Sequence, residues 1–258
     1  MQLNPRNKTL ASGIVLTLLL ILWYLITMSQ SQKAALLFPS PILVINTLAG
    51  QWQDILRYSL TTWYRVLLGL TIGTSLGVFA GILMTYNKWF YYLLDPIVEI
   101  IRPIPPIALT PFFILWLGLG DASQLLLISM GCFMIITVST FVGIANVNPI
   151  YIRAAQSLGA KKIYIYRSIY IPAITPSLLS GIRVALASAF ALTVAAEYLG
   201  AQGGLGFLIR NARTILHTET ILLAAIILGI ESLLTDQFLR VIFNQITKWT
   251  PKFNHIKS

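Results

Sequence analysis

Apolar residues fall into six long runs along the chain, separated by short polar or proline-rich stretches. A helix needs roughly 20 apolar residues to cross a bilayer. We therefore predict six transmembrane helices, over residues 10–28, 60–86, 96–119, 124–145, 176–200 and 221–243. A signal peptide is the alternative for the first run. Its apolar core is too long and no small-residue cleavage site follows closely, which favours a retained span.

The composition agrees with an all-α integral membrane protein. Of the 258 residues, 57% are hydrophobic and only 10% are charged, with a mean hydropathy of +0.79, which excludes a soluble globular domain. The net charge of +10 does not indicate nucleic-acid binding, because the basic residues are scattered at the ends of apolar runs. The single cysteine, Cys132, excludes an intramolecular disulfide, and His217 and His255 have no metal-ligand spacing.

The distribution of basic residues predicts the topology. With both termini in the cytoplasm, eleven of the eighteen basic residues lie in cytoplasmic segments and four in outer segments. The other three, Arg65, Arg102 and Arg183, fall within predicted spans. This excess follows the positive-inside rule and supports cytoplasmic termini. An amphipathic stretch over residues 44–56 is expected to lie on the outer membrane surface.

Four glycines recur at every fourth position in the second span. Gly69, Gly73, Gly77 and Gly81 would form one stripe on a helix face. Small residues let helix backbones approach closely in lipid, so we favour helix packing over a pore-lining role.

The third span contains a proline block that an unbroken helix cannot pass. Its prolines are Pro103, Pro105 and Pro106, next to Arg102, and Pro111 follows. Freed backbone groups at membrane depth must be buried in protein or face a wet cavity. This segment is therefore a candidate wall of a translocation path. A cytoplasmic re-entry before a shorter span is an equally open alternative.

The fifth span carries two ionisable residues, Arg183 and Glu197. Charges inside a span normally face protein or water, so both are candidates for the translocation path. Glu197 lies near the outer end, and an interfacial carboxylate is the alternative. Arg102 and Arg183 could favour an anion along this path.

The longest polar interruption, residues 146–172, predicts two short helices. Asn148 can cap the first, Pro149 suits its first turn, and Gly159 suits its end. A second helical run from Ala160 is expected to end before Pro172. The segment is either a basic cytoplasmic loop or a docking element for a partner.

A resemblance favours docking. Ala154-Ala155, Gly159 after three residues, and Ile169-x-Ile171-Pro172 resemble the EAA signature of ABC importer permeases, whose loop inserts into a groove on the ATPase. Arg153 stands where the family has Glu, so the ion pair of that Glu is not carried over. The coupling residues that the resemblance implies are Arg153, Ala154, Ala155, Gln156, Leu158, Gly159, Ala160, Lys161 and Pro172.

Three further blocks are similar to the nitrate, sulfonate and taurine group of these permeases. They are Pro39-Ser40-Pro41, the stretch from Asp95 through the proline block to Ala108, and Ala196-Glu197 with Gly203-Gly204-Leu205-Gly206. The resemblance implies a single permease domain of the type I importer fold over residues 1–258. Its core would cover about 58–245, with the coupling loop at 146–172.

The same resemblance implies partners and a location. These are two cytoplasmic ABC ATPase subunits, a second permease copy, an extracytoplasmic solute-binding protein and the bilayer, in the inner membrane of a prokaryote. The solute would be a small anion such as a sulfonate, taurine, nitrate or bicarbonate. A vitamin precursor resembling the thiamine pyrimidine is the alternative.

The chain itself carries no motif for catalysis. It has no phosphate-binding loop of the form G-x-x-x-x-G-K-[ST], and we expect ATP and Mg²⁺ in the partner ATPase, with no cofactor in this chain. An ion-coupled secondary transporter is a remoter alternative. It would predict paired mid-membrane carboxylates and an internal repeat, and no repeat is found. A membrane scaffold or sensor without transport activity is a third possibility.

Overall fold

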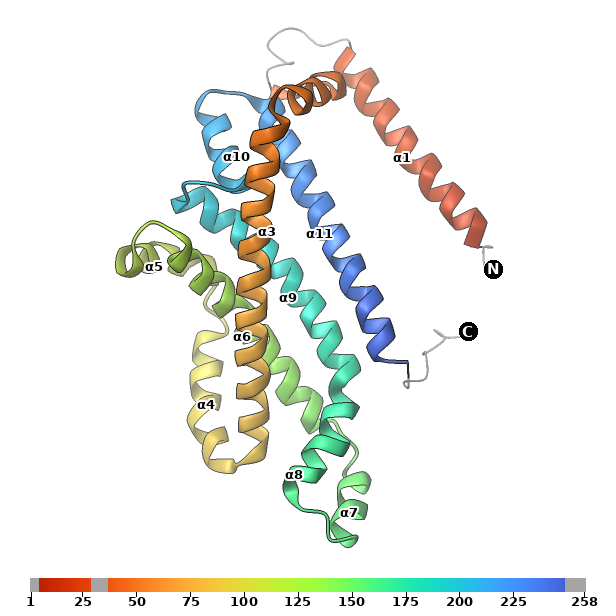
Figure 1. Ribbon diagram of the computed structural model, residues 1–258, viewed down its shortest axis with the longest axis vertical. Helices are drawn as coiled ribbons and strands as arrows, with labels where there is room; N and C mark the ends of the chain where they lie inside the picture. The colour runs from red at the N-terminus through yellow and green to blue at the C-terminus, as the bar shows by residue number, and fades with distance from the viewer. Residues whose placement is uncertain (1–4, 29–36, 249–258) are drawn as a thin grey trace.

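The computed structural model describes residues 5–28 and 37–248, and in these ranges the chain is helical without strands (Figure 1). This confirms the predicted all-α class. The helices are α1 (Pro5–Met28), α3 (Pro41–Tyr86), α4 (Lys88–Ile101), the 3₁₀ turn η1 (Pro106–Leu109), α5 (Thr110–Leu117), α6 (Asp121–Ala145), α7 (Pro149–Ser157), α8 (Lys162–Ile165), the π-helical turn η2 (Tyr166–Tyr170), α9 (Ile171–Gly200), α10 (Leu205–Thr214) and α11 (Thr218–Ile246).

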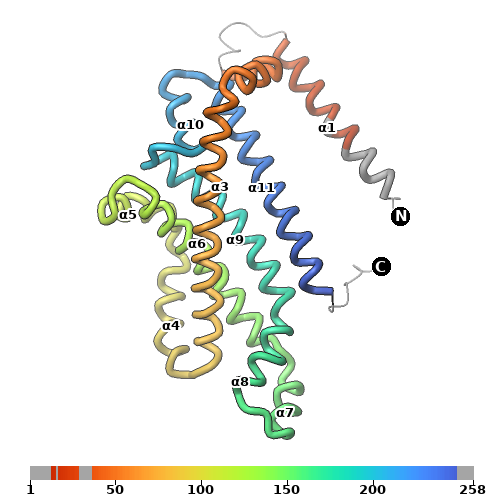
Figure 2. The backbone as a smooth tube through the Cα atoms, in the orientation of Figure 1, coloured from red at the N-terminus to blue at the C-terminus, as the bar shows by residue number. Residues whose placement is uncertain are grey.

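Four continuous helical segments are long and apolar enough to cross a membrane. They are α3, α6, the segment Lys162–Gly200 that ends in α9, and α11. A fifth span is possible if α4 and the η1–α5 segment, bent by 86° at their break, count as one. The described part of the chain is therefore a multi-spanning bundle. Figure 2 shows α3, α6, α9 and α11 running along its length, with α7 and α10 at opposite ends.

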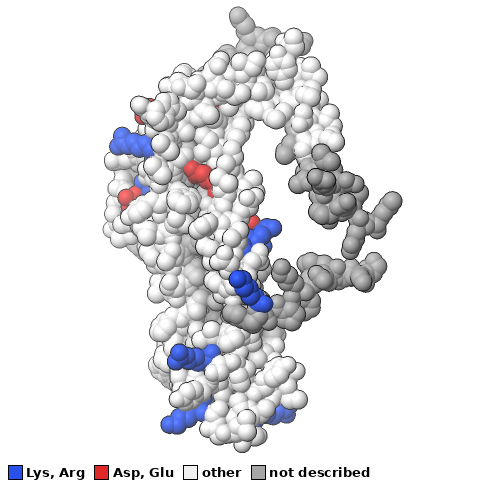
Figure 3. Space-filling model, turned by 45° about the vertical axis from the view of Figure 1, so that its right-hand side comes forward, with Lys and Arg blue, Asp and Glu red and all other residues white. Residues whose placement is uncertain are grey.

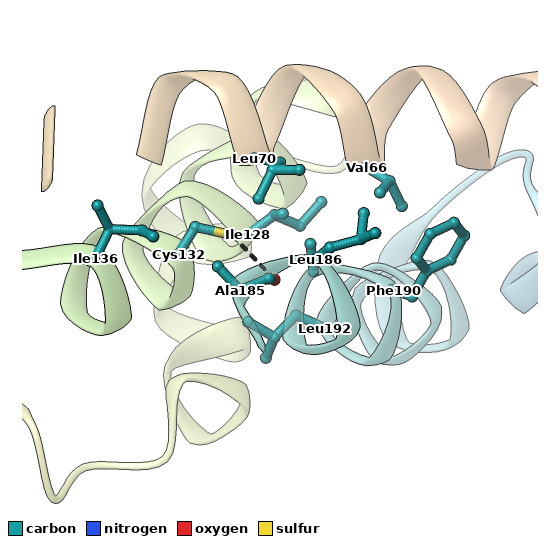
Figure 4. Close-up of a cluster of buried hydrophobic side chains, with 10 residues drawn as sticks. Val66, Leu70, Ile128, Cys132, Ile136, Ala185, Leu186, Phe190 and Leu192 are labelled. Carbon is teal, nitrogen blue, oxygen red and sulfur yellow. Dashed lines mark hydrogen bonds between the residues drawn. The ribbon is translucent and has the colours of Figure 1, made fainter. Parts of the chain in front are cut away.

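The core lies where α3, α6 and α9 meet (Figure 4). Val66 and Leu70 from α3 pack against Ile128 of α6 and against Leu186 and Phe190 of α9. Cys132 is also fully buried here, and its thiol lies 3.6 Å from the carbonyl oxygen of Ala185. Three helices that are distant in sequence thus share one close-packed centre.

The glycine stripe of α3 lies directly against α6. A Cβ at Gly69 would lie 2.5 Å from Ile128 Cγ2, and one at Gly81 would lie 2.6 Å from Thr140 Cβ. A Cβ at Gly73 or Gly77 would meet α6 side chains and backbone carbonyl oxygens as closely. The two backbones therefore approach to a distance that only glycine permits along this stripe.

The expected surface helix at 44–56 is not a separate element. It forms the first part of α3, which starts after the N-cap Ser40 and bends at Gln51, where φ is −125° and ψ is 19°. Figures 1 and 2 show this first part crossing one end of the bundle before the helix turns along it. The bend gives the amphipathic stretch its own direction without a loop.

The expectation that helix ends before Pro172 is wrong, and so is a fifth span starting at Pro176. Helical structure continues from Lys162 to Gly200. In η2 the N–H of Ile171 donates to the carbonyl oxygen of Tyr166, five residues earlier. This wider turn places Pro172 in the first turn of α9, where its missing N–H is tolerated.

The predicted break in the third span is confirmed, with different boundaries. α4 starts at Lys88, and not near Pro96, which lies inside that helix. The break falls between Ile101 and Pro106. Pro111 does not interrupt the chain again, because it lies in the first turn of α5.

The contact of α3 with α6 gives a direct stability test. We expect Gly73→Ala to destabilise the purified protein by about 1–3 kcal/mol, because its methyl group would meet backbone that cannot move aside. Gly229→Ala in α11 is the matched control, since nothing lies within 4 Å of a Cβ there. Thermal unfolding in detergent measures both. Equal midpoints for the two variants would contradict the close approach.

Candidate functional site

The segment with the coupling signature forms the end of the bundle that carries α7 and α8 (Figure 1). The Ile150 N–H donates to Asn148 Oδ1 at 3.0 Å, which caps the start of α7. At its other end the Gly159 and Ala160 N–H groups donate to the Gln156 and Ala155 carbonyl oxygens at 2.9 and 3.0 Å. This is a Schellman motif, with Gly159 at φ +76°. Both ends of α7 are therefore fixed by their own sequence.

The α7 segment offers its side chains to a partner. None of its residues is buried within this chain, and Leu158 is 88% exposed. Other large apolar side chains are exposed beside it: Ile150, Tyr151, Ile163 and Tyr164. We call this set with Leu158 the tip surface. An apolar group of this kind at the end of a bundle is typical of a protein interaction site.

The predicted coupling residues largely share this exposure. Exposed are Arg153, Ala154, Gln156, Leu158, Gly159 and Lys161, whereas Ala155, Ala160 and Pro172 are half-buried. Nothing within this chain lies within 4 Å of a Cβ built at Gly159. Steric tightness at Gly159, if it exists, must therefore come from a partner.

An aromatic cluster joins this segment to the bundle. The Tyr166 ring lies 5.2 Å from that of Tyr86 and 4.7 Å from that of Tyr170. Lys162 donates to the Tyr86 carbonyl oxygen, and its ammonium lies 4.2 Å from the centre of the Tyr86 ring. The end of α3 is therefore held to the start of the α8–α9 helical segment. This role of Lys162 was not predicted from the sequence.

Basic residues gather at the same end. They lie at the start of α4, on α7, on α8 with its N-cap, and on η2: Lys88, Arg153, Lys161, Lys162 and Arg167. Figure 3 shows lysine and arginine side chains clustered at this end of the surface it views. Such an excess is typical of a cytoplasmic face.

The proline block borders a hollow beside the middle of α6. The hollow measures about 370 Å³, and Arg102 and Pro106 line it together with Met130 and Met134 of α6 and Ser188 of α9. Pro103 and Pro105 lie in the break between α4 and η1. Two of the predicted path residues, Arg102 and Pro106, therefore line a hollow together with residues of the core helices α6 and α9.

Arg183 and Glu197, the other predicted path residues, lie elsewhere. Arg183 makes a bidentate pair with Asp236 of α11, at 2.6 and 2.9 Å, and Arg240 also donates to Asp236 at 3.1 Å. The Arg183 guanidinium is therefore engaged in holding α9 to α11. It does not line the hollow of Arg102.

Glu197 is fully buried, which rules out the alternative of an interfacial carboxylate. Arg65 Nη1 donates to Glu197 Oε1 at 2.8 Å, and Thr62 Oγ1 and the Gly206 N–H donate to Oε2, both at 2.9 Å. Arg65 also pairs with Asp121 at 2.7 Å and donates to the Gly203 carbonyl oxygen. We call these groups the Arg65–Glu197 cluster. It joins α3 to the starts of α6 and α10 and to the end of α9.

Sequence reasoning missed this cluster, although it identified both charges within spans. The signal was available, because an arginine inside a span needs a carboxylate partner. The Gly203-Gly204-Leu205-Gly206 stretch supplies the remaining contacts. A Cβ at Gly206 would lie 2.7 Å from Glu197 Cβ, so the glycine allows its N–H to reach the carboxylate.

The comparisons with known proteins agree on one class. The family described as binding-protein-dependent transport system inner membrane component matches residues 73–248. The taurine transport system permease TauC of Escherichia coli is 33% identical over 95% of this chain and 90% of that protein. The putative aliphatic sulfonates transport permease SsuC of Bacillus subtilis is 32% identical over 92% of this chain and 87% of that protein.

Solved structures match the fold. A bacterial ABC transporter involved in import of the acidic polysaccharide alginate has a TM-score of 0.65, with 17% identity over 94% of this chain and 97% of that chain. An amino acid ABC transporter has a TM-score of 0.62, with 17% identity over 77% of this chain and 97% of that chain.

The Arg65–Glu197 cluster predicts a large loss of stability when one partner is removed. We expect Glu197→Ala to cost about 3–5 kcal/mol, because Arg65, whose side chain is only 6% exposed, then loses its buried carboxylate and keeps Asp121 alone, which is 56% exposed. Thermal unfolding in detergent measures this. Arg240→Ala is the control: that side chain is 57% exposed, and its pair with Asp236 is worth about 0–1 kcal/mol. Similar losses in both variants would contradict a structural role of the cluster.

Proposed function

The chain belongs to the family of binding-protein-dependent transport system inner membrane components, and from this premise we propose its working assembly and solute. It is the permease subunit of an ABC importer. Like its relatives it is a transport subunit and not an enzyme. We propose that ATP and Mg²⁺ are bound by two separate cytoplasmic ATPase subunits, which associate with two copies of this chain.

The proposed topology has six spans and both termini in the cytoplasm of a prokaryote, with the chain in the inner membrane. The four continuous spans and the bent α4–α5 pair supply five candidates, and the shorter apolar stretch Gly13–Met28 of α1 is the proposed sixth. Figure 1 supports the orientation, because α1 rises from its start toward the α10 end, and α11 descends toward the α7 end. The basic residues around α7 support a cytoplasmic location for that end.

The proposed coupling element is the α7 segment with the tip surface. It connects α6 to the α8–α9 helical segment, and both helices belong to the core. A displacement of a capped, rigid α7 by an ATPase would therefore act on two core helices together. Alternating access would then follow from ATP-dependent approach of the two α7 segments and reset on hydrolysis.

The proposed solute is a small sulfonate, delivered by an extracytoplasmic binding protein. The observation that carries this proposal is the similarity to a taurine permease along 95% of the chain, joined by similarity to an aliphatic sulfonate permease. The permease contribution to the path would be the hollow beside the proline block, which Arg102 lines. Nitrate and bicarbonate are the smaller anions against which uptake would be compared.

Uptake by the complete importer tests the solute and the coupling element together. Cells that express the chain with its co-encoded ATPase and binding protein should accumulate radiolabelled taurine. Gly159→Asp should abolish both uptake and co-purification of the ATPase, because the new side chain meets the proposed groove of the partner. The permease itself should remain in the membrane, since the Cβ position is open within the chain.

Gly118→Asp is the matched control, because that glycine also has a positive φ, at +79°, and nothing lies within 4 Å of its Cβ position. It should retain uptake and the ATPase. Normal uptake in Gly159→Asp would remove the coupling role from this segment. Uptake of nitrate or bicarbonate without taurine or alkanesulfonates would contradict the sulfonate assignment and leave the importer class standing.

A further inference from the structure

An ion pair at the helix break is open to its surroundings at membrane depth. Arg102 Nη1 lies 3.2 Å from Glu99 Oε1, and the two side chains are 55% and 56% exposed. Arg102 follows the fourteen residues of α4, which places the pair about 20 Å along that helix from its start. The hydrocarbon core of a bilayer is about 30 Å thick, so a start of α4 at the membrane boundary would put the pair within the core.

Lipid is an unfavourable environment for these two charges. Ionisable groups within a span face protein or water, because their transfer into hydrocarbon is costly. The face of α4 that carries Glu99 and Arg102 must therefore border a wet space or a second copy of the chain. The neighbouring hollow of about 370 Å³ falls in the size range of small-molecule sites.

Of the three arginines predicted within spans, Arg102 is the least engaged within the described chain. Arg65 is enclosed in its cluster, and Arg183 is held to Asp236 by two hydrogen bonds from its guanidinium. Arg102 pairs through one nitrogen with Glu99, in the last turn of α4. A guanidinium has five N–H donors and matches a sulfonate well, so the remaining donors can bind one.

The hollow beside Arg102 combines one charged group with a soft apolar wall. Met130 and Met134 line it, and methionine side chains adapt to irregular ligands. Ser188 adds a hydroxyl from α9. A short carbon chain could lie against the methionines while its charged end contacts Arg102.

Glu99 changes which solute this arrangement favours. A plain anion at Arg102 would be repelled by the carboxylate beside it, whereas a dipolar solute could place an ammonium near Glu99 and its anionic head at Arg102. We propose that Arg102 and Ser188, which line the hollow, form a solute subsite in the permease itself together with Glu99, which borders the hollow through its pair with Arg102, and that the subsite selects a small zwitterion such as an aminosulfonate over a plain alkanesulfonate. This inference rests on the proposed import of sulfonates and adds a selectivity step within this chain.

A cysteine-protection experiment tests the subsite without depending on turnover. Ser188→Cys places a thiol in the hollow with little change in size, and the native Cys132 is fully buried. In membranes that hold the complete importer, taurine should slow labelling of this thiol by a hydrophilic methanethiosulfonate reagent. Ethanesulfonate, which lacks only the amino group, and ethylamine should protect about tenfold less well, a factor that corresponds to about 1.4 kcal/mol.

Second-site variants assign the roles of the two charges. Arg102→Gln in the Ser188→Cys background should abolish protection by taurine. Glu99→Gln should raise protection by ethanesulfonate to the level of taurine, because the repelling charge is gone. Arg240→Gln is the matched control, since Arg240 also pairs with a carboxylate of its own helix and is 57% exposed, yet lies on α11. Labelling without any solute shows whether each variant is folded with the hollow open.

Uptake of radiolabelled taurine by the same membranes separates the possible failures. Uptake without protection, or protection unchanged by Arg102→Gln, would overturn the subsite while leaving sulfonate import intact. Equal protection by taurine and ethanesulfonate would overturn the selectivity for a zwitterion. Protection without uptake would support the subsite and contradict the proposed function.

Discussion

The close approach of α3 to α6 is the contact on which the rest of the structure depends. Four glycines at every fourth position leave no side chain of α3 in the contact, so the side chains of α6 pack directly on the α3 backbone. In lipid no hydrophobic force draws helices together, so packing at short distance and internal polar contacts must do so. Once α3 and α6 are joined, α9 completes the centre through Leu186, Ala189 and Phe190.

Polar contacts then fix the two ends of this three-helix centre. At the α10 end the Arg65–Glu197 cluster ties α3, α6, α9 and α10 together. At the α7 end Lys162 and the ring cluster of Tyr86, Tyr166 and Tyr170 hold α3 to the α8–α9 helical segment. A permease built in this way can respond to a force at α7 as a unit, because the same helices carry both sets of contacts.

The features that sequence predicts well here are those with a local cause. Asn148 and Gly159 define α7 by cap and backbone conformation, and the proline block breaks the third span whatever lies around it. Class, family and the periodicity of the glycine stripe are likewise present in the sequence alone. The continuous helix through Pro172 was not predicted, because it depends on the π turn at Tyr166–Tyr170, which accommodates the pyrrolidine ring of Pro172.

Contacts between residues far apart in the chain could not be predicted from the sequence. Arg65 and Glu197 are 132 positions apart, and nothing local states that they meet. Arg183 was a candidate for the path and instead holds α9 to α11, since its partner Asp236 lies 53 positions away. The sequence shows that a charged residue lies within a span. Whether its role is functional or structural follows only from the residues that it contacts.

The claim at the centre of this account is that the tip surface docks an ATPase. A photo-activated cross-linking residue in place of Leu158, which is 88% exposed, tests it most directly in the native membrane. The account predicts a cross-linked product that contains an ATP-hydrolysing subunit, and none from the same probe at Ile215, which is 63% exposed at the opposite end. Such a product from Ile215, or its absence at Leu158, would contradict the account.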